Sequence, residues 1–131
     1  MPEEPVDVVR EVFARWERGA EALDLLAPDV EWEVVPDLFV GDGRFHGRDG
    51  VREFVRQWVG TWRDYRVELL ELEEVGPGRA LSVMREHARG RGSGAEVELT
   101  VAALWTVQDG LVARYRSFAT REDALRALEP S

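Results

Sequence analysis

The feature that most constrains the fold is a series of four alternating runs that fill the second half of the chain. The runs cover residues 65–75, 79–89, 95–107 and 111–119, and short glycine-containing segments separate them. Strands joined by connections this short pair antiparallel, and the Asp109-Gly110 pair is a strong hairpin signal. We therefore expect one antiparallel sheet. In the first run the apolar parity changes between Leu69 and Leu70, which predicts a bulge that bends this strand.

The first half of the chain is predicted to be mainly helical. Pro5 suits a first helical turn, and apolar residues recur at helical spacing from Val9 to Trp16, until Gly19. A short helical signal over 20–26 precedes alternation over 30–34, which predicts a strand. Residues 36–47 contain three glycines and no sustained period, so we expect a functional loop that acts as a lid.

A third predicted helix follows this loop and a fourth closes the chain. In the third helix Asp49 is expected to cap the start, and one apolar face runs from Val51 to Trp62. In the fourth, Thr120 followed three residues later by an acidic residue resembles a capping box.

Composition limits the classes of function. The 131 residues suit one domain over 1–131, and a net charge of −9 argues against a nucleic-acid partner. The chain has no cysteine, and none of its apolar runs approaches the roughly 20 residues that span a bilayer, so no membrane association is expected. The acidic N-terminal segment does not resemble a signal peptide, which predicts a cytoplasmic protein.

Parity within the strands predicts which side chains share the inner face of the sheet. Every odd position from 97 to 107 is apolar, which places Trp105 inside. Odd positions of the last run are also assigned inward, from Leu111 and Ala113 to Tyr115, Ser117 and Ala119. In the run 79–89 the bulkier apolar pair, Leu81 and Val83, favours the odd face as the inner one. That choice places Arg85 and His87 on the concave side.

The order of elements and the local sequence resemble the SnoaL-like domains of the nuclear transport factor 2-like superfamily. The matching segments are WERGAEALDLLAPDVEWEVVPD, FHGRDGVREFVRQW and GRGSGAEVELTVAALWTVQDGLVARYRSFATREDALRAL. The resemblance implies an α+β fold in which a curved antiparallel sheet wraps against helices as a cone around an apolar cavity. It does not imply one activity, because this fold supports isomerases, cyclases, hydrolases and proteins without chemistry.

Family catalytic residues transfer poorly to this chain. The catalytic Asp of ketosteroid isomerases falls at about Val34. The Arg of limonene epoxide hydrolases falls at Arg85, whereas their two Asp residues fall at His87 and near Ser117. The inward positions where SnoaL cyclases carry an acid/base His and Asp are mostly apolar here. None of the three catalytic sets is intact.

Histidine gives the best remaining catalytic candidate. His87 on a concave face could act as a general base near neutral pH, and Arg85 could stabilise an oxyanion. The alternative is that both only form cross-strand pairs with Glu86, Glu96 or Glu98. His46 lies in the glycine-rich loop, where solvent exposure is the more frequent outcome. Two histidines without ligand spacing predict no metal site, and no cofactor is expected.

The five tryptophans indicate a pocket for an apolar or aromatic small molecule. The predicted ligand-binding residues are Trp16, Trp32, Phe54, Trp58, Trp62, Trp105, Tyr115 and Ser117. Ser117 lacks a nucleophile-elbow motif, so a packing role is favoured over nucleophilic catalysis.

Three functions remain open on the sequence alone. One is a cofactor-free isomerase, cyclase or hydrolase that works by acid/base chemistry, and another is a non-catalytic ligand-binding protein. The third is an assembly domain that forms a homodimer through Ala102, Leu104 and Phe118 on the convex face. Polar side chains that converge on the inner face would favour an enzyme.

Overall fold

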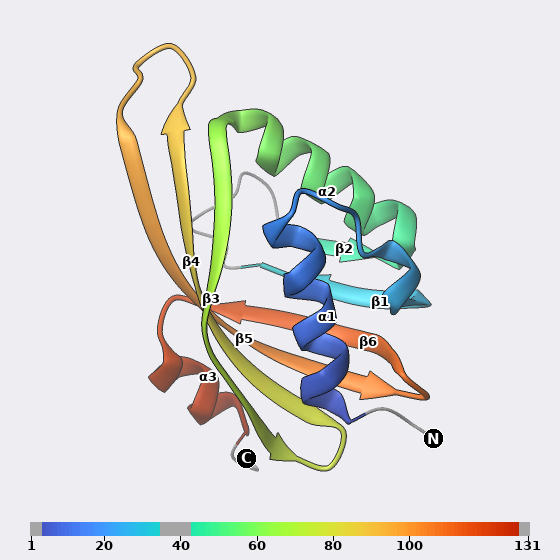
Figure 1. Cartoon of the computed structure of the whole chain (residues 1–131). Helices are drawn as coiled ribbons and strands as arrows, with labels where there is room; N and C mark the ends of the chain where they lie inside the picture. The colour runs from blue at the N-terminus through green and yellow to red at the C-terminus, as the bar shows by residue number, and fades with distance from the viewer. Residues whose placement is uncertain (1–3, 35–42, 129–131) are drawn as a thin grey trace.

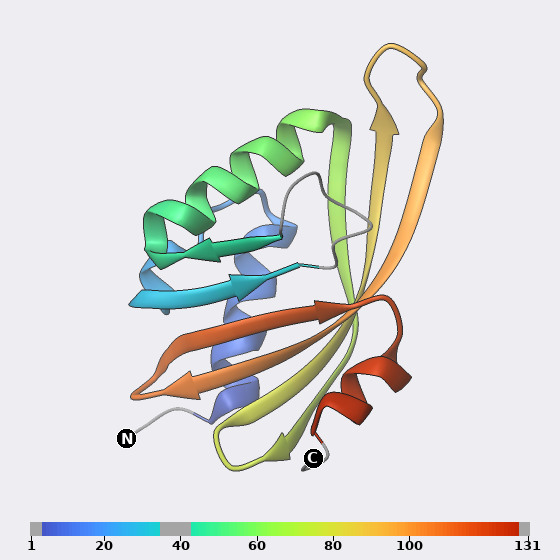
Figure 2. The ribbon, with the colours of Figure 1, turned by 180° about the vertical axis from the view of Figure 1, so that it is seen from behind.

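A six-stranded sheet forms the centre of the molecule in the computed structural model, which describes residues 4–34 and 43–128. The strand order is β2-β1-β6-β5-β4-β3, and the sheet curves strongly around its inner side (Figures 1 and 2). The strands are β1 (Leu26–Glu33), β2 (Arg44–His46), β3 (Trp62–Gly76), β4 (Arg79–Gly90), β5 (Glu96–Gln108) and β6 (Leu111–Phe118).

The predicted meander is confirmed, and one parallel pairing is added to it. Strands β3 to β6 pair antiparallel in sequence order. Strand β1 pairs with β6 in parallel, so the sheet is mixed and not purely antiparallel. The alternation over residues 30–34 predicted a strand but carried no information about its partner.

Helices cover both faces of the sheet. Helices α1 (Pro5–Glu17) and α2 (Gly47–Thr61) lie on one side, and α3 (Arg121–Leu128) lies on the other (Figures 1 and 2). We call the side under α1 and α2 the inner face and the side under α3 the outer face. The cap of α3 is as predicted, since the Asp123 amide donates to Thr120 Oγ1 at 3.0 Å.

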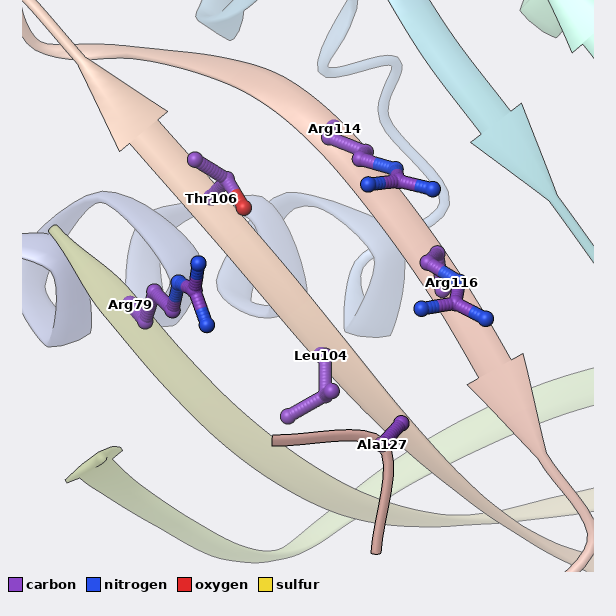
Figure 3. A pocket seen from close by; sticks show the side chains of 6 residues that line it. All are labelled: Arg79, Leu104, Thr106, Arg114, Arg116 and Ala127. Carbon is purple, nitrogen blue, oxygen red and sulfur yellow. The ribbon is translucent and has the colours of Figure 1, made fainter. Parts of the chain in front are cut away.

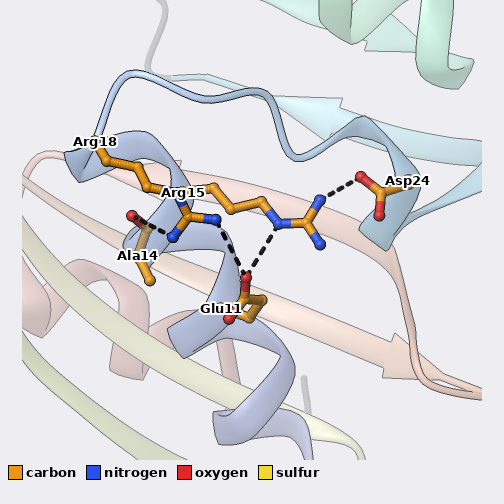
Figure 4. A network of polar contacts seen from close by, with 5 residues as sticks. All are labelled: Glu11, Ala14, Arg15, Arg18 and Asp24. Atoms are coloured by element: carbon orange, nitrogen blue, oxygen red, sulfur yellow. Dashed lines mark hydrogen bonds and ion pairs between the residues drawn. The ribbon is translucent and has the colours of Figure 1, made fainter.

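The helical signal over 20–26 predicts more helix than forms. Only a 3₁₀ turn, Leu23–Leu25, is present before β1 begins. Arg15 of α1 holds this turn, because its guanidinium pairs with both Glu11, at 3.1 Å, and Asp24 (Figure 4). A polar network therefore fixes the connection that a longer helix was expected to make.

Helix α2 also differs at its ends from the prediction. It begins at Gly47, so Asp49 lies in the first turn and does not cap the helix. It ends at Thr61, and Trp62 is the first residue of β3. The two tryptophans expected on one helical face therefore come from two elements.

Irregularities in the strands decide which side chains point inward. The predicted bulge in β3 is confirmed by a register shift between Leu69 and Glu71, and the Leu69 amide there donates to Glu17 Oε2 at 3.1 Å. A second shift separates Thr106 from Val107 in their pairing with β6. Because of it, Val112 packs into the inner core, where parity alone predicted Leu111 and Ala113.

The inner face of β4 is the even face, and the prediction that the odd face points inward is wrong. Ala80 and Met84 belong to the core under α1 and α2, whereas Leu81 and Val83 form a separate cluster with Ala124 of α3. Leu81 and Val83 are apolar although they point outward, because α3 covers this part of the outer face as well. The size of the apolar side chains therefore did not distinguish the inner face of β4 from its outer face.

The convex surface expected to form a dimer is partly covered by this same helix. Ala102 is 1% exposed, and Leu104 and Phe118 are half-buried and pack against the cluster that contains Ala124. Their outward parity is as expected, and the homodimer stays a prediction. Among the described residues, no helix has the length and apolar character needed to cross a bilayer.

Candidate active site

An aromatic cluster occupies the inner face where β1, β5 and β6 meet under α1. Trp32 stacks on Tyr115 with ring centroids 3.9 Å apart, and both rings contact Trp105 edge-on. All three side chains are at least 96% buried. The Trp105 indole N–H donates to Ser82 Oγ at 2.9 Å, which satisfies this buried donor. These rings therefore pack as core.

The other predicted ligand-binding residues surround this cluster. Trp16 contacts Trp32 and Trp105, and Phe54 contacts Trp32 from α2. Ser117 lies on the inner face beside Ala103, and the Tyr115 hydroxyl hydrogen-bonds with it. The structure thus brings the predicted aromatic set together on one face.

A second group lies on the inner face where α2 meets β3 and β4. Trp58 and Trp62 pack edge to face with centroids 5.5 Å apart, and both are only half-buried. Beside them lies Glu86, a carboxyl that is only 6% exposed. This group combines half-open indoles with a buried acid.

Glu86 is held at one of its two oxygens. The Trp58 indole N–H donates to Oε1 at 3.0 Å, and the Tyr65 hydroxyl donates to the same oxygen. Among the described residues, Oε2 has no hydrogen-bond partner and no cation pairs with the carboxyl. The orientation of the carboxyl is therefore set by the two hydrogen bonds at Oε1.

The surroundings of Glu86 favour its neutral form. Burial raises the pKa of Glu86, and the hydrogen bonds from Tyr65 and Trp58 oppose this only in part. Burial also raises the pKa of Tyr65 and of Tyr115, and the Glu86 charge adds to both shifts. Both phenols thus keep their protons and can donate hydrogen bonds.

Two buried indole N–H groups lack acceptors within the described part of the chain. They belong to Trp32, within the packed aromatic cluster, and to Trp62, beside Trp58. An unsatisfied buried donor is uncommon and is stabilised when an acceptor reaches it. Of the two side chains, only Trp62 is half-buried, whereas Trp32 is 2% exposed.

The two predicted catalytic residues lie on the outer face, away from this site. Arg85 Nε is 3.4 Å from Glu98 Oε1, and His87 lies between Glu68, at 3.4 Å, and Glu98, at 3.5 Å. The inward orientation predicted for both is wrong, because β4 turns its even positions inward. The alternative interpretation, cross-strand pairing with Glu98, is what the structure shows.

The remaining candidates are His46 and the predicted lid over residues 36–47. His46 is exposed in β2, with Nδ1 2.8 Å from Glu31 Oε1. Most of the predicted lid lies outside the described residues, and its last part forms β2 and the start of α2. Within residues 4–34 and 43–128, no three His, Asp or Glu side chains gather as metal ligands.

Sequence reasoning missed Glu86 as a functional residue, although a signal for it was available. Trp105 was correctly placed inward, and β4 pairs with β5 so that Ala80 faces Trp105 and Glu86 faces Leu99. Directly paired residues point to the same face of a sheet. The turn between β4 and β5 determines which of their residues pair. Together with the inward parity of β5, this pairing would have placed Glu86 on the inner face.

The chain is similar to known proteins along most of its length. The sequence profile of the SnoaL-like domain matches residues 9–115. A solved NTF2-like protein from Burkholderia thailandensis is 24% identical, with a TM-score of 0.80, and the match covers 98% of this chain and 99% of that one. No curated protein matches.

Two further solved structures share the fold. An NTF2-like protein of unknown function from Burkholderia pseudomallei is 21% identical, with a TM-score of 0.77 and coverage of 98% and 99%. TerC, co-crystallised with polyporic acid, is 19% identical, with a TM-score of 0.75 and coverage of 95% and 96%. These likenesses confirm the predicted α+β fold.

Proposed function

The chain belongs to the SnoaL-like domain family, and we propose that it binds a flat, apolar small molecule against the inner face and exchanges a proton with it through Glu86. The reaction class that fits is cofactor-free acid/base chemistry, such as isomerisation, cyclisation or hydrolysis. The proton moves between Glu86 Oε2 and an atom of the substrate.

One observation carries this proposal: on the face where the aromatic residues gather lies a buried carboxyl that pairs with no cation in the described part of the chain. Carboxyls used only for structure are usually paired or exposed, because burial of an unpaired charge is unfavourable. Raised carboxyl pKa values are typical of groups that transfer protons near neutral pH. Glu86 combines this environment with a free oxygen.

The neighbouring residues have distinct roles in this proposal. Tyr65 and Trp58 orient the carboxyl through Oε1, so the free oxygen keeps a constant position. The unsatisfied indole N–H of the half-buried Trp62 would donate to a developing negative charge on the substrate. The half-buried rings of Trp58 and Trp62 would contact the apolar body of the ligand.

A non-catalytic binding protein is the second candidate. It is favoured by the packed aromatic cluster around Trp105, which shows that much of the inner face is filled by side chains. In that case Glu86 would only connect α2, β3 and β4 through its two hydrogen bonds. The two functions differ in what a neutral isostere of Glu86 does.

Fluorescence titration with polyporic acid, the compound in the TerC crystal, tests binding first. We expect quenching of tryptophan emission, and Trp58→Ala should weaken binding by about 1 to 3 kcal/mol, the scale of one large apolar side chain. Absence of quenching by polyporic acid and by related aromatic acids would contradict the proposed ligand class.

Glu86→Gln then separates chemistry from binding. For any substrate found, the enzyme hypothesis predicts that the variant binds with similar affinity but loses turnover by about 100-fold or more, the usual contribution of a general acid or base. Glu98→Gln, on the outer face, is the matched control. Unchanged turnover in Glu86→Gln would exclude Glu86 as the proton-transfer group, whereas ligand binding without turnover of any compound tested would favour the binding function.

A further inference from the structure

Positive charge gathers in a cleft on the outer face, on the opposite side of the sheet from Glu86. The cleft has a volume of about 110 Å³ (Figure 3). It is lined by Arg79, Leu104, Thr106, Arg114, Arg116 and Ala127. None of these six described residues is acidic, although the chain carries a net charge of −9.

The sheet register arranges three of these side chains in one row. Thr106 of β5 pairs with Arg79 of β4 on one side and with Arg114 of β6 on the other. Neighbouring strands lie about 4.8 Å apart, so the two arginine backbones are roughly 10 Å apart with the threonine hydroxyl between them. Figure 3 shows Arg79 on one side of Thr106 and the other two guanidinium groups on the opposite side.

Two of the three arginines that line this cleft have no counter-charge in the described part of the chain. Arg79 and Arg114 form no ion pair there. Glu31 is the register neighbour of Arg114 on β1, but its carboxylate lies 2.8 Å from His46 Nδ1. Like charges on one face of a sheet repel each other, and an anion between the two guanidinium groups would offset that repulsion.

Arg116 adds positive charge at the edge of the cleft. Its Nε is 3.2 Å from Glu33 Oε2, and the other oxygen of Glu33 lies 3.3 Å from Arg44. One carboxylate is thus shared by two guanidinium groups, so the positive charge of Arg116 at the cleft is only partly balanced. The attraction for an anion therefore comes from β4 and β6 together.

We infer that this cleft binds an oxyanion, the phosphate or carboxylate group of a small molecule. Arg79 and Arg114 hold the group between them, and the Thr106 hydroxyl donates a third hydrogen bond from below. A guanidinium presents parallel N–H groups that match two oxygens of such an anion. The site is independent of Glu86, because the sheet separates them.

Titration with inorganic phosphate at low ionic strength, followed by the Thr106 amide in NMR spectra, tests this site. We expect saturable shifts at Thr106, and the Arg79→Gln/Arg114→Gln double variant should bind at least about tenfold more weakly. Thr106→Val should bind a few-fold more weakly. Both arginines are exposed, and circular dichroism should show that the double variant folds.

The matched control is Arg52→Gln/Arg56→Gln, which removes the same charge from the exposed side of α2. It should leave phosphate affinity unchanged. Equal weakening in both double variants, or no saturation up to about 10 mM phosphate, would overturn the inference. If phosphate fails to bind while the Arg79/Arg114 variant converts a dimer to a monomer in sedimentation, the cleft instead holds an acidic group of a second copy, which also overturns it.

Discussion

The two faces of β4 give opposite environments to residues that are adjacent in sequence. Glu86 on the inner face is buried and pairs with no cation among the described residues, whereas Arg85 and His87 on the outer face share the exposed carboxylate of Glu98. Histidine is the residue type usually expected to move protons, but here it lies in an ion-pair cluster. The comparison shows that burial and partners, more than residue type, decide which group can exchange a proton.

The largest expected difference between the faces is in packing. Trp105→Ala should lower the free energy of unfolding by about 3 to 5 kcal/mol, because it removes a fully buried ring that contacts four other aromatic side chains. Leu104→Ala, the neighbouring residue on the outer face, should lower it by less. Denaturant unfolding measures both, and equal losses would mean that the inner face is not the main core.

The next effect is a pH dependence of stability that belongs to Glu86. Its folded pKa is raised, so above about pH 4.3 the folded protein retains a proton that the unfolded chain has lost. The free energy of unfolding should therefore fall as pH rises from there to the folded pKa, by about 1.4 kcal/mol for each pH unit between the two pKa values.

Glu86→Gln removes this titration and should remove the fall. Its advantage over the wild type should grow through the same pH window, as unfolding curves measured between pH 4 and pH 8 would show. Glu98→Gln is the control, and its curve should run parallel to the wild type within about 0.5 kcal/mol, as for exposed ion pairs. If Glu86→Gln also runs parallel, the raised pKa is refuted.

A smaller effect is expected from the hydrogen bond between Tyr65 and Glu86. Tyr65→Phe removes a donor that favours the carboxylate, so the pKa of Glu86 should rise further and the pH window should extend upward. At pH 8 the variant should be less stable by about 1 kcal/mol, the usual value of one such bond. Tyr115→Phe leaves both bonds to Glu86 in place, and an equal shift in that variant would argue against a specific role for Tyr65.

The smallest effects are expected on the outer face. Arg85→Ala and His87→Ala should each change the free energy of unfolding by less than about 1 kcal/mol, because both ion pairs are partly exposed. Neither should alter quenching by an aromatic ligand, because the inner face is intact. Loss of ligand binding or turnover in His87→Ala would restore the role that the sequence suggested for it.

Much of the fold could be predicted because its signals are local. Alternation and glycine turns predicted the meander, and a parity change predicted the bulge near Leu69. The parallel pairing of β1 with β6 depends on contacts between distant segments, which periodicity does not encode. The 3₁₀ turn before β1 depends on Arg15, whose pairing with Asp24 is likewise tertiary.

The candidate site was predictable only in its apolar part. Trp105 and Tyr115 were placed inward by the alternation in their strands, and Trp32 was assigned to the ligand pocket together with the other tryptophans. The run 79–89 is apolar on both faces between Ala80 and Met84, since α3 covers one side and α1 and α2 the other. The pattern of one strand alone then does not show which face points inward. The wrong face was assigned, so the predicted catalytic residues were the neighbours of Glu86 and not Glu86 itself.

The most direct test of the role of Glu86 is a carbon-13 NMR titration of its side-chain carboxyl, assigned by comparison with Glu86→Gln. The account predicts one glutamate carboxyl with a midpoint above the usual value of about 4.3, which moves higher still in Tyr65→Phe. A midpoint at or below that value would show that the buried carboxyl is ionised throughout the neutral range. That result would contradict the raised pKa and would exclude Glu86 as a general acid near neutral pH.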